Sequence, residues 1–319
     1  MPRPILLGIC GDSGAGKTTL TRGLVRILGE NQVTHIDGDH YHRHSRTRRA
    51  ELGITPLHPD ANHLDILEQH LVHLRAGEAI LKPVYRHRDG TLGPAEYVSP
   101  AQFTIVEGML GFHTPGMRET YDVRIFLDPP EDLRRRWKVQ RDCSRRGYTT
   151  DEVLAELDRR EADSETFIGP QRRYADIVIS FMPGDRGDAE HLDVKLAMRP
   201  GLAHPDLPSP AADGSGIRMT QRGSETQLWI PGTIDPEHSA AFEEAIWDRL
   251  HFATHLRTER LGEFTIGTEL HRSEPLAVAQ LLVLYQLVTA RAAVALGANG
   301  ARADQDAGGQ SAATALGAA

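Results

Sequence analysis

The sequence has little cysteine and no excess of positive charge. Two cysteines, Cys10 and Cys143, stand among 319 residues, which excludes a scaffold held by several disulfides and a zinc site built from CxxC pairs. The 36 basic and 44 acidic side chains give a net charge of −8, which argues against a general binder of nucleic acid or anionic membranes. We therefore expect small-molecule substrates, with no nucleic-acid or membrane partner.

Long uninterrupted hydrophobic runs are also absent. The first apolar run, 5–10, is too short for the core of a signal peptide, and Asp12 follows it closely. The apolar stretch 275–296 is broken by Gln280, Gln286 and Arg291, which favours a buried helix over a membrane span. Together with the low cysteine content, these absences predict a soluble protein of the cytoplasm.

Strand and helix patterns alternate over residues 1–182. Apolar runs predict strands, and apolar residues at helical spacing predict helices. The predicted strands cover 4–10, 33–37, 103–106, 123–127 and 177–181, and the predicted helices cover 19–28, 62–76, 130–146 and 151–160. This alternation predicts an α/β core with a mostly parallel sheet and helices on both of its faces.

The pattern changes after residue 182. Residues 183–216 are rich in Pro, Gly and Asp and read as a connector with one strand near 191–198. Residues 217–297 are predicted to form a smaller α+β extension packed on the core, with a strand at 226–230 and helices at 237–250 and 275–296. Residues 298–319 have low complexity and no apolar period, so we expect a disordered tail.

A glycine-rich loop follows the first predicted strand and opens the first predicted helix. It matches G-x-x-x-x-G-K-[ST], whose backbone N–H groups hold phosphates, and its context between a strand and a helix disfavours a chance glycine-rich turn. Lys17 is placed to reach the β- and γ-phosphates of ATP, and the Thr18 hydroxyl can bind Mg²⁺. The loop makes the predicted core one of the P-loop NTPase type. The residues expected to bind ATP here are Gly11, Asp12, Ser13, Gly14, Ala15, Gly16, Lys17, Thr18 and Thr19.

An acidic residue ends the predicted strand 103–106. Glu107 fits the strand-end acid that completes a Mg²⁺ site with Thr18, although an ordinary strand-end carboxylate is the plainer interpretation. No guanine-reading N-K-x-D motif is present, so a GTPase is disfavoured.

The acceptor side follows the strand 33–37. The carboxyl ends of strands in an open α/β sheet face the ligand crevice, so a carboxylate there can take the proton of an attacking hydroxyl. Asp39 is our predicted base and Asp37 its rival, while a helix N-cap is the structural alternative. The segment 40–49 gathers histidines and arginines, which suits a phosphorylated acceptor or, more simply, a solvated face.

A second basic segment covers 134–146. Arginines on a hinged pair of helices suit a lid that closes over the transferring phosphoryl group. Arg134, Arg135 and Arg136 point in several directions and are predicted to be surface charge. Two histidine pairs at helical spacing, His70/His73 and His251/His255, lack an acidic third ligand, which disfavours a metal site.

These residues together resemble the phosphoribulokinase family, within the wider group that includes uridine kinase. The resemblance covers about 4–182. It rests on the phosphate loop and on these further segments: Asp39-His-Tyr-His42 with Arg46, Leu57-His-Pro-Asp60 with Asn62, Lys82-Pro-Val-Tyr85-Arg-His87, Val106-Glu107-Gly108, Trp137-Lys-Val-Gln-Arg141-Asp142, Arg146-Gly147-Tyr148-Thr149 and Pro170-Gln171 with Tyr174-Ala-Asp176.

The resemblance implies transfer of the ATP γ-phosphoryl group, with Mg²⁺, to O1 of ribulose 5-phosphate, which gives ribulose 1,5-bisphosphate for carbon fixation in the Calvin cycle. It implies that Asp39 is the base, that Asp142 is a second essential acid, and that Arg141 and Arg146 are lid residues at the ATP phosphates. The implied sugar-phosphate contacts are His42, Arg46, Tyr85, His87 and Lys138. Family members form homo-oligomers, so a homodimer or larger homo-oligomer is expected.

The sequence departs from the family pattern at two places. After Val-Glu-Gly the family has Leu-His, whereas Leu110 stands here and the next histidine is His113. Regulated members carry a cysteine in the phosphate loop where this chain has Ala15, so no disulfide switch of that kind is expected. Two other functions stay open: a uridine kinase-like nucleoside kinase, and an inactive regulatory protein that binds ATP.

Overall fold

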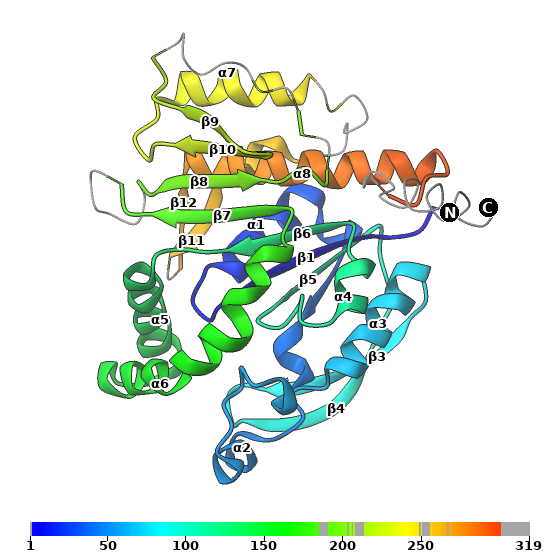
Figure 1. Ribbon diagram of the computed structural model, residues 1–319, viewed down its shortest axis with the longest axis vertical. Coiled ribbons are helices and arrows are strands. Elements are labelled where there is room, and N and C mark those ends of the chain that lie inside the picture. The colour runs from blue at the N-terminus through cyan, green and yellow to red at the C-terminus, as the bar shows by residue number, and fades with distance from the viewer. Residues whose placement is uncertain are drawn as a thin grey trace, which may run out of the picture.

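The computed structural model describes residues 2–300 except 185–190, 203, 206, 208–213, 249, 251–255 and 267. An eight-stranded sheet in the order β2-β5-β1-β6-β7-β8-β10-β9 runs through the middle of the molecule (Figure 1). Its strands are β1 (Ile5–Gly11), β2 (Val33–Asp37), β5 (Phe103–Gly108), β6 (Val123–Leu127), β7 (Ile177–Met182), β8 (Asp193–Met198), β9 (Arg218–Arg222) and β10 (Glu225–Ile230).

Two strand pairs lie outside this sheet, and helices connect the strands. The pairs are β3 (Ile80–Arg86) with β4 (Thr91–Val98), and β11 (Glu263–Ile266) with β12 (Glu269–Arg272). The α-helices are α1 (Lys17–Leu28), α2 (Arg46–Leu52), α3 (Leu64–Ala76), α4 (Pro115–Thr120), α5 (Glu131–Arg146), α6 (Thr150–Asp163), α7 (Pro236–Trp247) and α8 (Glu274–Ala295).

The neighbouring strands β2, β5, β1, β6 and β7 of the central sheet are parallel, as predicted for the core. β1 pairs in parallel with β5 and β6, which in turn pair in parallel with β2 and β7. The strand predicted inside the connector is β8, and it pairs antiparallel with both β7 and β10. The C-terminal part therefore continues the same sheet. The predicted tail, 298–319, lies outside the described residues from 301 onward.

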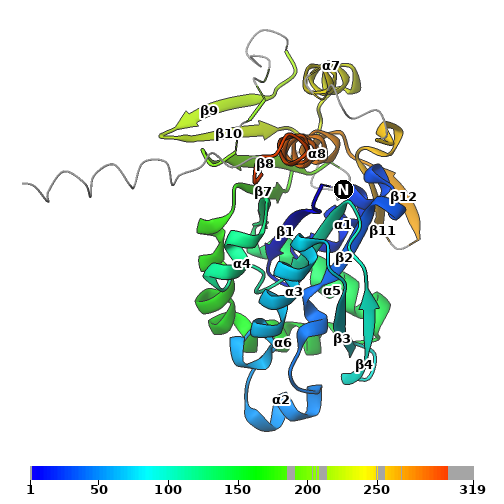
Figure 2. The same ribbon diagram turned by 90° about the vertical axis from the view of Figure 1, so that its right-hand side faces the viewer.

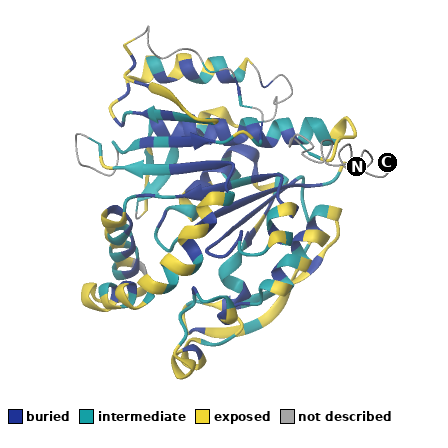
Figure 3. Cartoon of the chain, viewed as in Figure 1, coloured by how far each residue is buried: buried dark blue, intermediate teal, exposed yellow. Residues whose placement is uncertain are grey.

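The two faces of the sheet carry separate hydrophobic clusters. Ile5, Leu7 and Ile9 face a cluster completed by α1, α7 and α8, whereas Leu6 and Cys10 face a cluster completed by α3 and α4. This alternation is the period of two that a strand imposes, and burial on both faces explains why β1 is apolar throughout. Figure 3 shows the buried strands in the middle and exposed residues on the outlying helices and hairpins.

Helix α8 is long and apolar enough to cross a membrane by length and composition alone. In the fold it packs along the sheet, and residues such as Leu281, Leu284 and Leu287 are fully buried. The prediction of a buried core helix over 275–296 is therefore confirmed.

Several elements gather at one end of the molecule. Figure 1 shows α2, the β3–β4 hairpin, α5 and α6 below the sheet. Figure 2, turned by 90°, keeps these elements below the parallel strands, with the C-terminal strands β9 and β10 at the upper edge of the sheet. The lower elements surround the region where the parallel strands end, and there the candidate site lies.

Candidate active site

The glycine-rich loop lies between β1 and α1 and adopts a backbone that side chains disfavour. Gly14 and Gly16 have φ of 87° and 94°, in the left-handed region that glycine tolerates best. A Cβ on Gly14 would lie 3.0 Å from the Cβ of Lys138 and 3.1 Å from the carbonyl oxygen of Arg134. Helix α5 therefore packs directly on this loop, and that contact leaves no room for a side chain.

The side chain of Lys17 is held over the glycine-rich loop. Lys17 Nζ donates hydrogen bonds to the carbonyl oxygens of Gly11 at 2.8 Å and Asp12 at 2.9 Å. These bonds curl the side chain across the loop, where an ammonium group can contact β- and γ-phosphates. Thr18 and Thr19 are exposed on the first turn of α1. The predicted ATP-binding segment thus forms one continuous concave loop at a helix N-terminus.

Two oxygen ligands suited to Mg²⁺ lie together. The Thr18 hydroxyl donates to Glu107 Oε2 at 3.1 Å, and Glu107 Oε1 is 2.9 Å from Nε2 of His35. This is the pairing that the sequence predicts, because the loop after β1 and the end of neighbouring β5 meet at one edge of the sheet. Mg²⁺ commonly takes one or two protein oxygens and completes its shell with phosphates and water, so this pair fits the ion.

His70 and His73 belong to no group of three or more His, Cys, Asp or Glu side chains that could hold a metal among the described residues. His70 Nδ1 instead lies 2.9 Å from the hydroxyl of Tyr41. The pair His251/His255 lies outside the described residues.

Asp37 and Asp39 take different structural roles. Asp37 Oδ1 accepts a hydrogen bond of 2.9 Å from the backbone N–H of Asp39 and caps the short 3₁₀ turn Gly38–Tyr41. The N-cap that the sequence left open as an alternative thus belongs to Asp37. The carboxyl group of Asp39 is left free of the cap and lines a pocket next to Glu107.

The surroundings shift the pKa values of these two carboxyl groups in opposite directions. Burial, reinforced by the nearby charges of Asp39 and Glu107, raises the pKa of Asp37 to about 7. Burial alone would also raise the pKa of Asp39, but the charges of His42, which is protonated in the acid range where Asp39 titrates, and of Lys17 outweigh burial and lower it. Asp39 is therefore the ionised member of the pair at neutral pH, as a base must be.

The acceptor side is built from β3 and the segment before α2. His42 is 4% exposed, and its Nδ1 lies 2.7 Å from Oδ1 of Asn62. Its ring meets that of Tyr85 edge-on at 4.7 Å, and Arg49 donates to the Tyr85 hydroxyl at 2.8 Å. Burial lowers the pKa of His42 to about 4, so this ring is neutral at pH 7.

Two further predicted substrate contacts border this cluster. Arg46 Nη2 donates to the carbonyl oxygen of His87 at 2.6 Å, which ties the start of α2 to the end of β3. The ring of His87 lies 5.1 Å from that of Tyr85, and the backbone N–H of Tyr85 donates to Nδ1 of His40 at 3.0 Å. The residues predicted to contact the sugar phosphate from this side thus form one connected group.

The lid residues of α5 gather around one carboxylate. Asp142 accepts from Lys138 Nζ at 2.7 Å and from Arg141 Nε at 2.8 Å, and it lies 3.5 Å from Nη1 of Arg146. Burial alone would raise the pKa of Asp142, but the hydrogen bonds from Arg141 and Lys138 lower it to about 2. Arg141 also reaches to 3.5 Å from Ser13 Oγ in the phosphate loop. Three cations around one anion leave positive charge for a phosphate.

The prediction that Arg134 is surface charge is wrong. This residue is 8% exposed, and its Nη1 donates to the carbonyl oxygen of Ser13 at 2.9 Å and lies 3.4 Å from Asp12 Oδ2. Arg134 faces the phosphate loop because α5 packs across that loop. The spacing of residues along α5 alone does not predict this contact.

Helix α6 brings to the site another arginine, Arg160, which the sequence did not identify as a site residue. Ser164, at the end of α6, hydrogen-bonds to Asp12 of the phosphate loop, and Asp163 accepts from Thr55 Oγ1 at 2.6 Å. Arg160 stands one turn earlier on the same helix face. It is ion-paired with Glu156, and its buried Nε has no hydrogen-bond partner among the residues that the structure describes. Burial lowers the pKa of Arg160 against the opposing fields of Glu156 and Asp39.

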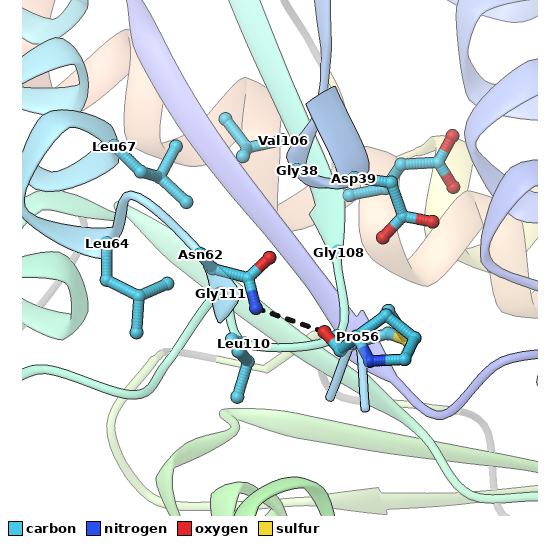
Figure 4. Close-up of a pocket in the computed structure, with 12 residues that line it drawn as sticks. Gly38, Asp39, Pro56, Asn62, Leu64, Leu67, Val106, Gly108, Leu110 and Gly111 are labelled. Atoms are coloured by element: carbon cyan, nitrogen blue, oxygen red, sulfur yellow. Dashed lines mark hydrogen bonds between the residues drawn. The ribbon is translucent and has the colours of Figure 1, made fainter. Parts of the chain in front are cut away.

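A pocket opens beside Asp39 and has an apolar wall. Asp39 and Glu107 line it together with Leu64, Leu67 and Leu110. Figure 4 shows Leu64 and Leu67 across the pocket from Asp39, with Asn62 between them, bonded to the carbonyl oxygen of Pro56 at 3.0 Å.

Leu110 therefore faces the acceptor side, at the position where the family pattern has a histidine. His113 does not line this pocket; its ring lies 6.5 Å from that of Phe167.

Comparison with known proteins agrees with the geometry of the site. The model of the phosphoribulokinase / uridine kinase family matches residues 6–186. The phosphoribulokinase of Synechocystis sp. is 34% identical over 235 residues, which are 73% of this chain and 71% of that protein. The chloroplastic phosphoribulokinase of Triticum aestivum is 33% identical over 251 residues, which are 72% of this chain but less than two thirds, 62%, of that protein.

A solved structure shares the fold. The phosphoribulokinase from Rhodobacter spheroides aligns with a TM-score of 0.57 and 21% identity and covers 77% of this chain and 97% of that one. At this identity the likeness supports the α/β architecture and carries no residue roles.

Proposed function

Because the chain belongs to the phosphoribulokinase / uridine kinase family and is a kinase, we propose that it transfers the γ-phosphoryl group of ATP to O1 of ribulose 5-phosphate. The product is ribulose 1,5-bisphosphate, the acceptor for carbon fixation in the Calvin cycle. The observation that carries this proposal is the ionised Asp39, which lines the acceptor pocket within the field of Lys17 and Arg141. The cytoplasmic location and a homodimer or larger homo-oligomer stay predictions.

Asp39 performs the proton transfer in this proposal. Its carboxylate accepts the proton of the O1 hydroxyl while that oxygen attacks the γ-phosphorus in line. The bond between the γ-phosphorus and the β,γ-bridging oxygen breaks, and ADP leaves. Asp37, whose pKa burial raises to about 7, is half protonated at neutral pH and already caps a turn, so it is the poorer base.

The cations of the loop and the lid offset the negative charge of the transition state. Lys17 contacts the β- and γ-phosphates, and Arg141 and Arg146 close over them from α5. Thr18 and Glu107 would hold Mg²⁺, and the ion would supply further positive charge to the transferring phosphoryl group.

The acceptor's own phosphate requires cations that the ATP site does not use. Lys138 on the lid, together with Arg46 and the Arg49–Tyr85 pair, supplies them on the acceptor side. His42 and His87 provide neutral or weakly basic rings for sugar hydroxyls. A neutral nucleoside acceptor would offer these cations no phosphate to bind.

The experiment that tests the proposal is acceptor-dependent release of ADP from Mg-ATP, run in parallel with ribulose 5-phosphate, ribose 5-phosphate and uridine. We expect turnover with ribulose 5-phosphate alone. Turnover with uridine would move the chain to the nucleoside kinases. ATP binding without turnover on any acceptor would favour the inactive regulatory protein.

A further inference from the structure

The side chain of His35 in β2 lies on the face of the sheet that α1 covers. β2 pairs in parallel with β5, so His35 is opposite Ile105 and Asp37 is opposite Glu107. Ile105 packs in the hydrophobic cluster that α1 completes. Because residues two apart along a strand share a face, His35, Asp37 and Glu107 all project toward α1. The proposed proton transfer and phosphoryl transfer assign no part to this histidine.

The carboxylate of Glu107 is held at both of its oxygens. Nε2 of His35 lies 2.9 Å from Oε1, and the Thr18 hydroxyl donates to Oε2 at 3.1 Å. Within the described part of the chain, these are the two groups that hydrogen-bond to this carboxylate. The Glu107 side chain is 4% exposed and that of His35 is 38% exposed. The histidine therefore reaches the buried carboxylate from β2, the strand at the edge of the sheet.

The hydrogen bond from His35 engages the Glu107 oxygen that Thr18 does not contact. Because a carboxylate oxygen only accepts, Nε2 is the donor, and it carries a hydrogen for this bond whether the ring is neutral or charged. The oxygen beside the Thr18 hydroxyl is the one that this arrangement leaves for a metal ion. Carboxylates that bind metals are commonly oriented by such a second partner, and its removal usually lowers metal affinity by roughly 10–100-fold.

Neighbouring carboxyl groups make the orientation of Glu107 important. Asp37 lies opposite Glu107 in the register of β2 and β5, and Asp39 lines the same pocket as Glu107. Burial and the charges of Asp39 and Glu107 raise the pKa of Asp37, which shows how closely the three groups interact. The ionised Asp39 repels the Glu107 carboxylate, and the N–H of His35 holds Glu107 in place against this repulsion.

We propose that His35 is a positioning residue of the Mg²⁺ site, whose Nε2–H fixes one oxygen of Glu107 and thereby presents the other oxygen, beside Thr18, to the ion. This inference rests on the proposed function only in taking Mg²⁺ as the ion that accompanies the nucleotide. It does not depend on the identity of the acceptor.

The test is the affinity of Mn²⁺, a substitute for Mg²⁺ that electron paramagnetic resonance detects, for the enzyme with bound ADP and no acceptor. The enzyme is kept in excess over ADP, and the signal of free Mn²⁺ gives the Kd. His35→Leu removes the donor, and we expect it to raise the Kd for Mn²⁺ about tenfold. His35→Gln keeps an N–H at a similar distance from the backbone and should stay within about threefold of the wild type.

Two controls separate the metal site from the rest of the fold. His73 also pairs with a glutamate, Glu78, but at an exposed position on α3, so His73→Leu should bind Mn²⁺ like the wild type. Calorimetric binding of ADP in EDTA should give the same Kd for the wild type and His35→Leu, because the phosphate loop itself is unchanged. If His35→Leu does not fold, His35→Asn, whose amide is too short to reach Glu107, takes its place.

Three outcomes would overturn the proposal. The first is wild-type affinity for Mn²⁺ in His35→Leu. The second is an equal loss in His35→Leu and His35→Gln, which would mean that the donated hydrogen bond is not what matters. The third is an equal loss of ADP binding in EDTA, which would place the defect in the phosphate loop. Because no acceptor is present, a failure to phosphorylate ribulose 5-phosphate would leave this readout intact.

Discussion

Lys138 and Asp142 form an ion pair of 2.7 Å one turn apart on α5, and both side chains are almost fully buried, with 3% and 4% exposure. Removing two charges from water is costly, and a buried pair repays that cost only when its other hydrogen bonds are also made. Asp142 meets this condition through the hydrogen bond from Arg141, and Arg146 adds an ion-pair contact at 3.5 Å. The pair therefore fixes an ammonium group on the lid, and in the proposed function the acceptor's phosphate shares it.

Lys138→Ala should separate the two substrates. We expect it to raise the KM for ribulose 5-phosphate more than tenfold, because the acceptor phosphate loses its cation, and to leave the KM for ATP within about twofold. Steady-state kinetics with each substrate varied in turn measures both constants. A defect confined to the KM for ATP would assign Lys138 to the donor side instead.

Asp142→Asn should destabilise the fold itself. Breaking a buried pair from one side leaves an unpaired buried charge and costs about 3 kcal/mol. Asp158→Asn, which removes the exposed partner of Arg135, is the matched control and should cost less than about 1 kcal/mol. Urea unfolding of both variants measures the two free energies, and equal values would contradict the structural role of Asp142.

Asp39→Asn tests the base. We expect kcat to fall by roughly 10²–10⁴, the usual contribution of a positioned general base, with the Kd for ADP unchanged. Asp37→Asn keeps an oxygen that can accept from the N–H of Asp39 and should lower kcat less than about tenfold. If the larger loss follows Asp37→Asn, the roles of the two carboxyl groups are reversed.

The raised pKa of Asp37 should appear in the pH dependence of stability. Between pH 4 and pH 7 the native state holds a proton on Asp37 that the unfolded chain has lost, so this group makes the free energy of unfolding fall as pH rises. The shift from 3.8 to about 7 corresponds to up to about 4 kcal/mol over that window. Asp37→Asn should remove this fall.

Comparing the wild type with Asp37→Asn isolates the contribution of Asp37 to the pH dependence of stability. His42, whose pKa burial lowers to about 4, contributes a rise in stability over nearly the same pH range, but it does so in both proteins. The measurement is urea unfolding without Mg²⁺ at pH 4.5 and pH 7.5. The same pH dependence in wild type and variant would mean that Asp37 is ionised in the folded protein.

The sequence predicts the core of the fold well and the hairpins poorly. The strands β1, β5, β6 and β7 of the central sheet are short, mostly apolar runs, so each can be predicted without knowing its neighbours. In contrast, β3 and β4 contain Pro83 and Pro94, which disfavour strand interiors, and Pro83 sits at a register shift between Lys82 and Val84. The strands β11 and β12 have four residues each, too few to show an alternating pattern.

The candidate site also contains residues that the sequence predicts and residues that it does not. Thr18 and Glu107 could be paired from the sequence because both follow the carboxyl ends of strands that a P-loop core places side by side. Arg134 and Arg160 could not be assigned, because each stands among other arginines on a charged helix. Which of them turns inward depends on how α5 and α6 pack on the phosphate loop, and no local pattern records that packing.

Arg160→Gln tests the residue that the sequence missed. Arg159 and Arg160 both pair with Glu156, but the Arg159 side chain is 71% exposed, whereas that of Arg160 is 19% exposed. The Nε of Arg160 is buried and has no hydrogen-bond partner in the described part of the chain. A guanidinium held one turn from the contact between Ser164 and the phosphate loop can bind the transferring phosphoryl group when the lid closes. We expect Arg160→Gln to lower kcat at least tenfold and Arg159→Gln to leave kcat within about twofold. Steady-state kinetics of the two variants provides the comparison, with urea unfolding to show that both are folded; equal kcat values would restrict Arg160 to holding α6 in place.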